Sequence, residues 1–419
     1  MADARDSTGL NAERGVRSDW AERAEALAAS DGLQTAVSLF HRERKWINER
    51  HLELCRTPAL TFREQQRAEL LGEMFADLGL AAQIDEAGNV IAPIIFDKRL
   101  PFVAMTAHLD TALAPARPRD VYVDPDGTMR GPGVTDNGVG LAALLAVARA
   151  LGGGVPVANP WANVLLVGNT AEEGEGNLYG MKHLCNQSRW AERIKAYLVV
   201  DGASTSHITI EALGSRRFEI ALEARGGHSW NDFGRVNPVH ALGRAVSALA
   251  DIELPSSPRA TLTAATIEGG SGVNAIPASA RTKIDIRSRD EATIDRLASK
   301  MEDAVRRAVE QENRRSSDRM QSVRIREIGH RPAAPRSDAN WMIDCLQAVD
   351  SQLGVRSRLD CASTDANVPL AAGLPAATIG AGGRGGDAHA PTEWYQPEGR
   401  AIGLQRVYLA LALTLECGA

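Results

Sequence analysis

Short apolar runs alternate with helical segments from residue 102 onward, and this alternation limits the possible fold more than any other feature of the sequence. The runs have the length of buried strands, and the longer segments between them carry apolar residues at helical spacing. The expected strands are residues 102–107, 164–168 and 197–200, and the expected helices are residues 141–151 and 178–187. Strands that alternate with helices form a parallel sheet covered by those helices. We therefore expect an α/β domain, preceded by two amphipathic helices at 33–54 and 62–80.

A second pattern interrupts the first between residues 215 and 327. Its order is strand, helix, strand, strand, helix, strand, which is that of a ferredoxin-like βαββαβ unit. The α/β pattern resumes afterwards with a helix at 340–353 and a strand at 376–379. We therefore expect one domain made of residues 21–214 and 328–419, a second domain inserted at 215–327, and a disordered tail at 1–20.

Composition excludes several classes of protein. The formal net charge is −6 and no basic stripe occurs, which argues against a nucleic-acid binder. No stretch reaches the roughly 18 uninterrupted apolar residues of a membrane span, and the N-terminus lacks the apolar core of a signal peptide. The five cysteines are scattered without a C-x-x-C pair, so the sequence predicts neither a disulfide framework nor a thiolate zinc site. A reducing cytoplasm fits this cysteine usage best.

Metal-capable side chains follow four of the predicted strands. They are His108 and Asp110, Glu172 and Glu173, Asp201, and His389. In an open α/β sheet, ligands bind outside the carboxyl ends of the strands, so these groups should meet in one crevice. Any one of them alone is most simply a solvated surface residue. Together they would place uncompensated negative charge in the crevice unless a cation binds there.

The type of side chain indicates which ion binds. Histidine and carboxylate ligands without cysteine suit zinc, with manganese or cobalt as alternatives. A site for two ions needs a carboxylate that both can share. Asp136, in Thr135-Asp136-Asn137-Gly138 just before a predicted helix, is the natural candidate for that bridge. The alternative is a plain helix N-cap.

These motifs resemble those of a known enzyme family. They are His108-Leu109-Asp110, Gly133-Val134-Thr135-Asp136-Asn137-Gly138, Glu172-Glu173-Gly174, Asp201-Gly202 and His389-Ala390-Pro391. In order and spacing they are similar to the metal-site motifs of the co-catalytic zinc peptidases, which include aminoacylase, carboxypeptidase G and peptidase T. The resemblance runs from about residue 62 to the C-terminus. It implies a mixed-sheet α/β catalytic domain whose inserted domain serves as a lid and as a dimerisation surface.

The resemblance also assigns roles to the residues of the site. It implies that two ions share Asp136, that His108 and Asp201 complete one site, and that Glu173 and His389 complete the other. Glu172 would then be the general base, whereas the simpler reading of Glu172-Glu173 is a pair of solvated acids. Asp110 is placed to accept the second N–H of His108, or else it caps a turn. The family also implies a cis peptide bond at Asp136-Asn137.

Four further residues are candidates for substrate contact. His228, in Arg225-Gly226-Gly227-His228-Ser229, resembles the lid histidine that reaches the active site of a dimer partner, and the alternative is an ordinary surface histidine. Asn274 and Arg287 resemble lid residues that contact substrate, although Arg287 could equally form a strand salt bridge. Arg384 lies in a glycine-rich loop that formally matches G-x-G-x-x-G. That loop runs on to His389 instead of opening a helix, which argues against a dinucleotide site.

The predicted function is hydrolysis of an amide bond in a small peptide or an N-acyl amino acid. A hydroxide that bridges two divalent ions would attack, with Glu172 as base and His228 polarising the carbonyl. The sequence contains no G-x-S-x-G elbow and no P-loop, so it indicates neither a serine hydrolase nor a nucleotide-phosphate hydrolase. Two alternatives stay open: a two-metal amidohydrolase that acts on a carbamoyl or ureido group, and an inactive metal-binding scaffold. A homodimer formed through the inserted domain is expected.

Overall fold

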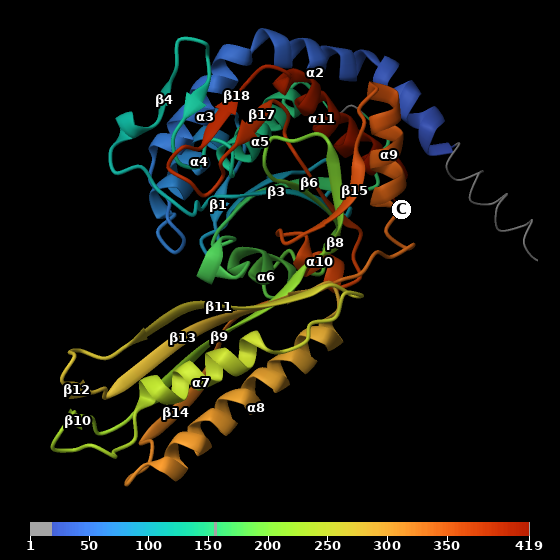
Figure 1. The fold of residues 1–419 in the computed structure, drawn as a ribbon. Helices are drawn as coiled ribbons and strands as arrows, with labels where there is room; N and C mark the ends of the chain where they lie inside the picture. The colour runs from blue at the N-terminus through green and yellow to red at the C-terminus, as the bar shows by residue number, and fades with distance from the viewer. Residues whose placement is uncertain (1–18, 155–156, 419) are drawn as a thin grey trace, which may run out of the picture. The chain divides into compact units, whose positions relative to one another are not determined.

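The structure is a computed structural model that describes residues 19–154 and 157–418 (Figure 1). The chain divides into two compact units. The first unit comprises Met1–Ile210 and Arg336–Ala419, and the second unit comprises Glu211–Pro335. The second unit is therefore inserted into the first, and it extends a few residues beyond the predicted limits of 215 and 327 at both ends. No helix among the described residues is long and apolar enough to cross a membrane.

An eight-stranded sheet organises the first unit. Its order is β1 (Gln83–Ile84), β2 (Val90–Ile94), β6 (Asn163–Asn169), β3 (Phe102–His108), β7 (Ile194–Val200), β16 (Ala376–Ile379), β8 (His207–Ala212) and β15 (Arg358–Ala362). The strands β6, β3, β7 and β16 are parallel to one another. The strands β2 and β8 pair antiparallel with this group, so the sheet is mixed. The four parallel strands bring their carboxyl ends to one edge of the sheet.

Helices cover both faces of this sheet because its central strands are apolar on both sides. Every residue of β3 and β6 is buried. One face packs against α4 (Gln65–Asp77), α5 (Gly138–Leu151), α9 (Met342–Leu353) and α11 (Arg400–Cys417), with α2 (Asp31–Arg42) and α3 (Arg44–Arg56) in the same core. The other face packs against α6 (Tyr179–Asn186) and α10 (Asn367–Ala371). The apolar helix α5 is the innermost of them, since nearly all of its residues are buried.

A small second sheet, which the sequence pattern does not predict, lies in the same unit. Its order is β17 (Arg384–Gly386), β18 (Trp394–Gln396), β5 (Met129–Arg130) and β4 (Tyr122–Val123). Through these strand pairs, the glycine-rich loop after β16 is hydrogen-bonded to the segment that precedes α5.

The predicted N-terminal tail at 1–20 can be compared with the structure only at its last two residues. Its residues 1–18 lie outside the described residues, whereas residues 19–29 are helical. Trp20 is buried, and its ring stacks on that of Trp341 with 5.9 Å between the centroids. Burial of a large aromatic ring stabilises this helix against the first unit, so the prediction of disorder is wrong for Asp19 and Trp20.

The second unit has the predicted strand and helix order. Its elements are β9 (Gly214–Glu223), α7 (Pro238–Ala250), β11 (Ala260–Gly269), β13 (Ser279–Ser288), α8 (Glu291–Arg315) and β14 (Ser322–Arg331). They form an antiparallel sheet in the order β11-β13-β9-β14, and α7 and α8 pack on one face against Phe218, Ile220 and Ile284. Two short strands, β10 (Gly227–His228) and β12 (Ala275–Ile276), pair beside it.

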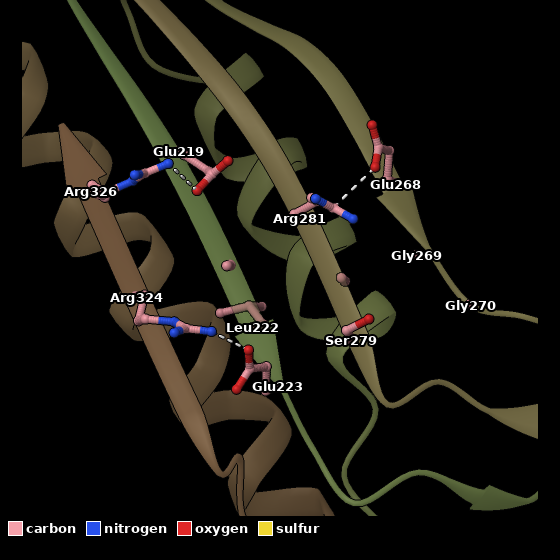
Figure 2. Close-up of a pocket in the computed structure, with 12 residues that line it drawn as sticks. Glu219, Leu222, Glu223, Glu268, Gly269, Gly270, Ser279, Arg281, Arg324 and Arg326 are labelled. Atoms are coloured by element: carbon pink, nitrogen blue, oxygen red, sulfur yellow. Dashed lines mark hydrogen bonds and ion pairs between the residues drawn. The ribbon is translucent and has the colours of Figure 1, made fainter. Parts of the chain in front are cut away.

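The other face of this sheet is charged, because polar residues alternate with the buried apolar ones along the two central strands, β9 and β13. Arg326 pairs with Glu219 at 3.0 Å and Arg281 pairs with Glu268 at 3.1 Å, and Arg324 forms a further ion pair with Glu223 (Figure 2). These cross-strand pairs belong to the exposed side of the unit.

Candidate metal centre

The carboxyl ends of the parallel strands bring the predicted metal-capable side chains together. The strand β3 ends at His108, β6 ends three residues before Glu172, and Asp201 follows the last residue of β7. His389 comes from the loop between β17 and β18, and Asp136 comes from the loop before α5. Segments that lie far apart in the sequence therefore supply one cluster.

Two overlapping groups of side chains in this cluster could each hold a metal ion. One group is His108, Asp136 and Asp201, and the other is Asp136, Glu173 and His389. Within each group all the candidate ligand atoms lie within 4.8 Å of one another. Oδ1 of Asp136 lies 2.9 Å from Nε2 of His108, and Oδ2 lies 3.0 Å from Nε2 of His389. The two oxygens of one carboxylate thus face different imidazoles, which is the arrangement that a bridging ligand requires.

The charges of the cluster suit a cation. The ion pairs of Asp136, Glu173 and Asp201 are with the two imidazoles. Hydrogen bonds to Asp136 and Glu173 raise the pKa of His389 to about 10. Burial alone would lower the pKa of His108, but its hydrogen bonds to carboxylates outweigh burial and hold the pKa well above its ordinary value. The positive charges of two protonated imidazoles partly balance the negative charges of three carboxylates here. Divalent ions bound by the same atoms would balance them more completely.

A third group of potential ligands is His108, Glu172 and Glu173. Both glutamates are buried. Glu173 also belongs to the group with Asp136 and His389, whereas Glu172 belongs to neither of the groups that share Asp136. Glu172 is therefore the acid of this pair that stays uncoordinated if two ions share Asp136.

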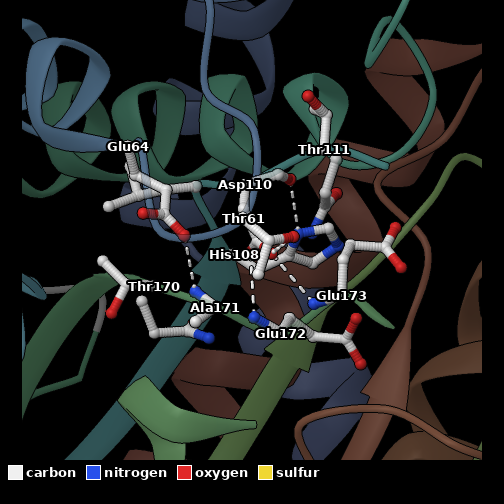
Figure 3. Close-up of polar contacts among 12 residues, drawn as sticks. Thr61, Glu64, His108, Asp110, Thr111, Thr170, Ala171, Glu172 and Glu173 are labelled. Carbon is white, nitrogen blue, oxygen red and sulfur yellow. Dashed lines mark hydrogen bonds and ion pairs between the residues drawn. The ribbon is translucent and has the colours of Figure 1, made fainter. Parts of the chain in front are cut away.

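Asp110 contacts the second ring nitrogen of His108 with both its backbone oxygen and its carboxylate. Nδ1 of His108 lies 2.9 Å from the backbone oxygen of Asp110 but 3.5 Å from its carboxylate, so the backbone carbonyl orients the imidazole. The carboxylate instead accepts hydrogen bonds from the backbone amides of Glu172 and Glu173, each at 2.9 Å (Figure 3). Thr61 donates to it as well, at 2.9 Å. Asp110 thus positions both glutamates through their backbone.

A second buried carboxylate supports the same loop. Oε1 of Glu64 accepts hydrogen bonds from the amides of Phe62 and Ala171, at 2.9 and 3.0 Å. Ala171 has a φ of 52°, which an L-residue seldom adopts, and it directly precedes Glu172. The hydrogen bond that the amide of Ala171 donates to Glu64 therefore fixes the backbone at the point where the chain turns into the site.

Glu393 is a supporting residue that the sequence pattern does not single out. Its carboxylate accepts hydrogen bonds from the amides of Gly133, Thr135 and Asp136, over 2.7 to 3.0 Å. Asn137 fixes the other side of this loop, because its Nδ2 donates to the carbonyl of Val200 at 2.8 Å. The Asp136-Asn137 peptide bond is cis, as the family resemblance implied. The only available signal was the place of Glu393 four residues after His389.

The predicted substrate contacts fall in different places. Arg384 lies in β17 of the first unit, is exposed, and pairs with Glu398 at 2.7 Å. His228 and Asn274 lie together in the second unit, where the amide of Ser229 donates to the carbonyl of Asn274 at 3.0 Å. Arg287 lies near the far end of β13, roughly 25 Å from the strand start next to β12 at the usual rise per residue. There its Nε donates to Asp285 at 2.6 Å, an ion pair within the strand.

Comparison with known proteins identifies the family. The sequence model of peptidase family M20/M25/M40 matches residues 104–413, which include every candidate ligand. The chain belongs to this family. The resemblance to the co-catalytic peptidases is thereby confirmed, and the protein is a hydrolytic enzyme of the metallopeptidase and amidohydrolase type.

Solved structures show the same fold. The aminopeptidase PepT from Bacillus cereus is 18% identical with a TM-score of 0.67, and the alignment covers 88% of this chain and 97% of that one. The di-peptidase Dug1p from Saccharomyces cerevisiae is 17% identical with a TM-score of 0.68, covering 91% and 98%. An amidase of the hydantoinase/carbamoylase family from Burkholderia vietnamiensis is 16% identical with a TM-score of 0.67, covering 89% and 97%. At these identities the likeness establishes the shared fold.

Proposed function

We propose that this protein hydrolyses the amide bond of a small peptide or an N-acyl amino acid with two divalent metal ions. One observation carries the proposal: the two carboxylate oxygens of Asp136 face two separate sets of ligands. Membership in a peptidase family supports it, as does a fold shared with an aminopeptidase and a di-peptidase.

The chain's own residues would hold the ions. His108 and Asp201 would complete one site and Glu173 and His389 the other, with Asp136 shared. The donor set of imidazoles and carboxylates favours zinc, with manganese or cobalt as alternatives. When bound, the two ions would polarise the scissile carbonyl and lower the pKa of the attacking water.

Glu172 is proposed as the general base. Its backbone is anchored by Asp110, and its side chain lies beside the proposed ligand Glu173 without belonging to the groups that share Asp136. An uncoordinated carboxylate in this place can take a proton from the attacking water and return it to the nitrogen of the leaving amine. Asp110 and Glu64 contribute by holding the turn that presents Glu172.

The second unit is proposed to supply substrate contacts and a dimer interface. Nδ1 of His228 accepts a hydrogen bond from the amide of Trp230 at 3.1 Å, so a neutral ring carries its proton on Nε2. That N–H can donate to a substrate carbonyl, and His228 is exposed. Asn274 beside it is proposed to contact substrate, as are Arg287 and Arg384, whose planar guanidinium groups suit a carboxylate. The homodimer that would present His228 to a partner follows from the family resemblance.

A second candidate function is hydrolysis of a carbamoyl or ureido group. The amidase of the hydantoinase/carbamoylase family has the same TM-score to this chain as the aminopeptidase PepT. The proposed ligands and base serve either reaction, because both break a C–N bond at a carbonyl carbon. Only the substrate distinguishes the two functions.

The test uses the full chain, stripped of metal and reloaded with zinc, manganese or cobalt. Dipeptides, tripeptides, N-acyl amino acids and N-carbamoyl amino acids are then offered to each form. We expect Glu172→Gln to lower kcat by about 10²-fold or more on the best substrate and to leave two ions bound per chain by elemental analysis. Glu175→Gln, at an exposed neighbour, is the control with unchanged kcat. Full turnover by Glu172→Gln would contradict the proposed base, and turnover of the carbamoyl compounds alone would favour the second function.

A further inference from the structure

A pocket that no sequence motif indicated opens beside the metal centre in the first unit. The space measures about 1430 Å³ with its solvent-open mouth included, and the candidate ligand Asp201 is part of its lining. Its walls come from the loop after β7, from β8, from the end of β15 and from the glycine-rich loop that contains Arg384. A substrate that reaches the metal centre would therefore have this space next to its scissile bond.

The inner wall of the pocket is lined by three buried threonines. They are Thr209 on β8, Thr364 after β15 and Thr378 on β16, and each is less than a tenth exposed. Thr209 and Thr378 face each other across the two strands, and Oγ1 of Thr364 lies 2.7 Å from Oγ1 of Thr378. Oγ1 of Thr364 also accepts from the amide of Ala366 at 3.3 Å. The hydroxyl pair has two hydrogens and uses one between its members, so the other can donate to a ligand.

Fixed charge is confined to the rim of this pocket. The charged residues that line it are Asp201, which faces His108, and Arg384 and Asp387, which are both exposed. Burial lowers the pKa of His207, the remaining titratable group of the wall, which favours the uncharged ring. Ala203, Ala362 and Trp394 add apolar surface, and Ser204 and Ser206 add further hydroxyls to the lining.

We propose that this pocket receives a side chain of the substrate and selects one that is uncharged and forms hydrogen bonds, such as that of Ser, Asn or Gln. An apolar side chain would cover the buried hydroxyls and leave a donor unpaired, which costs binding free energy. A charged side chain would lose its hydration without gaining a counter-ion at the inner wall. The inference rests on the proposed function, because it names the substrate class of the same site.

The decisive variant is Thr378→Val, which keeps the shape of the side chain and removes its hydroxyl. A dipeptide panel carries Ala, Ser, Asn, Gln, Leu, Asp or Lys at either position. We expect the wild-type enzyme to favour Asn and Gln over Leu, Asp and Lys at one position by about tenfold or more in kcat/KM. Thr378→Val should lower kcat/KM for Asn and Gln about tenfold, mainly through KM, and should leave the Ala substrate within about twofold. Thr378→Ser keeps a hydroxyl and should retain the preference.

Two results would overturn the inference: an equal loss by Thr378→Val on every substrate, or a wild-type preference for Leu, Asp or Lys at both positions. If Thr378→Val does not bind two ions or loses its circular dichroism spectrum, Thr209→Val tests the same wall and should give the same selective loss. Thr263→Val, on an exposed strand of the second unit, is the matched control. Failure of the proposed function is a different outcome, namely that the wild-type enzyme hydrolyses none of the dipeptides, tripeptides, N-acyl amino acids and N-carbamoyl amino acids of the first test.

Discussion

The carboxylate of Glu393 accepts a hydrogen bond from the backbone amide of Asp136 at 3.0 Å, and the same oxygen accepts from Thr135 at 2.7 Å. Its other oxygen accepts from Gly133 at 2.8 Å. One buried side chain thus holds the loop that carries the proposed bridging ligand, although it is not itself a ligand. Such supporting hydrogen bonds set the orientation of metal ligands and hence the affinity for the ion.

This relationship predicts the effect of Glu393→Gln. The amide group of Gln can accept with only one of its two ends, so its NH₂ would face a backbone N–H of the loop. We expect the affinity for the second zinc ion to bind to fall by about 10- to 100-fold, and we expect excess zinc to restore activity. Competition with a fluorescent chelator measures the affinity. Thr392→Ala, at the exposed neighbour, should leave it unchanged, and an unchanged affinity in Glu393→Gln would show that the loop holds its shape without this carboxylate.

Metal binding should release protons from the site. Hydrogen bonds to Asp136 and Glu173 raise the pKa of His389 to about 10, so the ion-free protein holds a proton there at neutral pH. A metal ion requires the neutral imidazole and must displace that proton. Affinity should therefore rise with pH up to about pH 10 and fall as the pH is lowered, by up to about tenfold per pH unit for each proton released.

Calorimetry in two buffers of different ionisation enthalpy counts these protons. We expect at least one proton per chain on zinc loading at pH 7, released by the cluster as a whole because its groups titrate together. A chelator should reverse the loading and abolish turnover. Zinc binding without proton release at pH 7 would mean that the imidazoles are already neutral in the ion-free protein.

The strand ends explain why much of the metal cluster could be predicted. His108, Glu172 and Asp201 each lie just beyond an apolar run, and apolar runs are local features of the sequence. The inserted unit could be predicted for the same reason, since its strand and helix order is also local. Glu393 could not, because its partners are backbone amides of a distant loop and no side-chain pattern encodes them. For Asp110 the position was predictable, but the division of labour between its carbonyl and its carboxylate depends on the turn it makes.

The strands β8 and β15 show the same limit in the fold. The neighbours of β8 in the sheet are β16 and β15, and both lie far from β8 in the sequence. Local sequence patterns therefore cannot predict this pairing, which depends on the tertiary structure. The small sheet of β17, β18, β5 and β4 consists of two- and three-residue strands, which are too short to give a periodic signal. The pocket beside Asp201 depends on several of these elements and was equally invisible in the sequence.

Arg406 and Asp350 form a buried ion pair in the core of the first unit. The guanidinium donates from Nε to Oδ1 at 2.5 Å and from Nη2 to Oδ2 at 2.8 Å, and Arg406 is fully buried. Asp350→Ala would leave the guanidinium without a counter-ion, and we expect a loss of about 3–5 kcal/mol in the free energy of unfolding. Urea unfolding followed by circular dichroism measures this loss.

An exposed pair provides the comparison for Arg406 and Asp350. Glu302 pairs with Arg306 one helical turn away at 3.3 Å on the surface of α8. Glu302→Ala should cost less than about 0.5 kcal/mol. Equal effects of the two substitutions would contradict the argument that burial sets the difference.

Gly138 begins α5 directly after the cis bond, and its missing side chain leaves room for a close packing contact. A Cβ atom at Gly138 would lie 2.2 Å from Sγ of Cys55 and 2.6 Å from the carbonyl oxygen of Gly133. Either contact is far shorter than van der Waals distance, so Gly138→Ala must displace the loop that carries Asp136. We expect it to lower both metal affinity and kcat, by at least about tenfold each, since misplacement of ligands by about 1 Å has effects of that size.

The clash predicts that a second substitution rescues the first. Cys55→Ala removes the sulfur atom, so the double variant should recover part of the lost metal affinity, while the contact with the carbonyl of Gly133 prevents full recovery. Gly243→Ala, where a Cβ meets nothing within 4 Å in the helix α7, is the control and should leave metal affinity unchanged and increase stability by up to about 1 kcal/mol. Metal affinity and kcat of the four variants are measured together. Strictly additive effects of Cys55→Ala and Gly138→Ala would show that the sulfur atom is not what resists the new side chain.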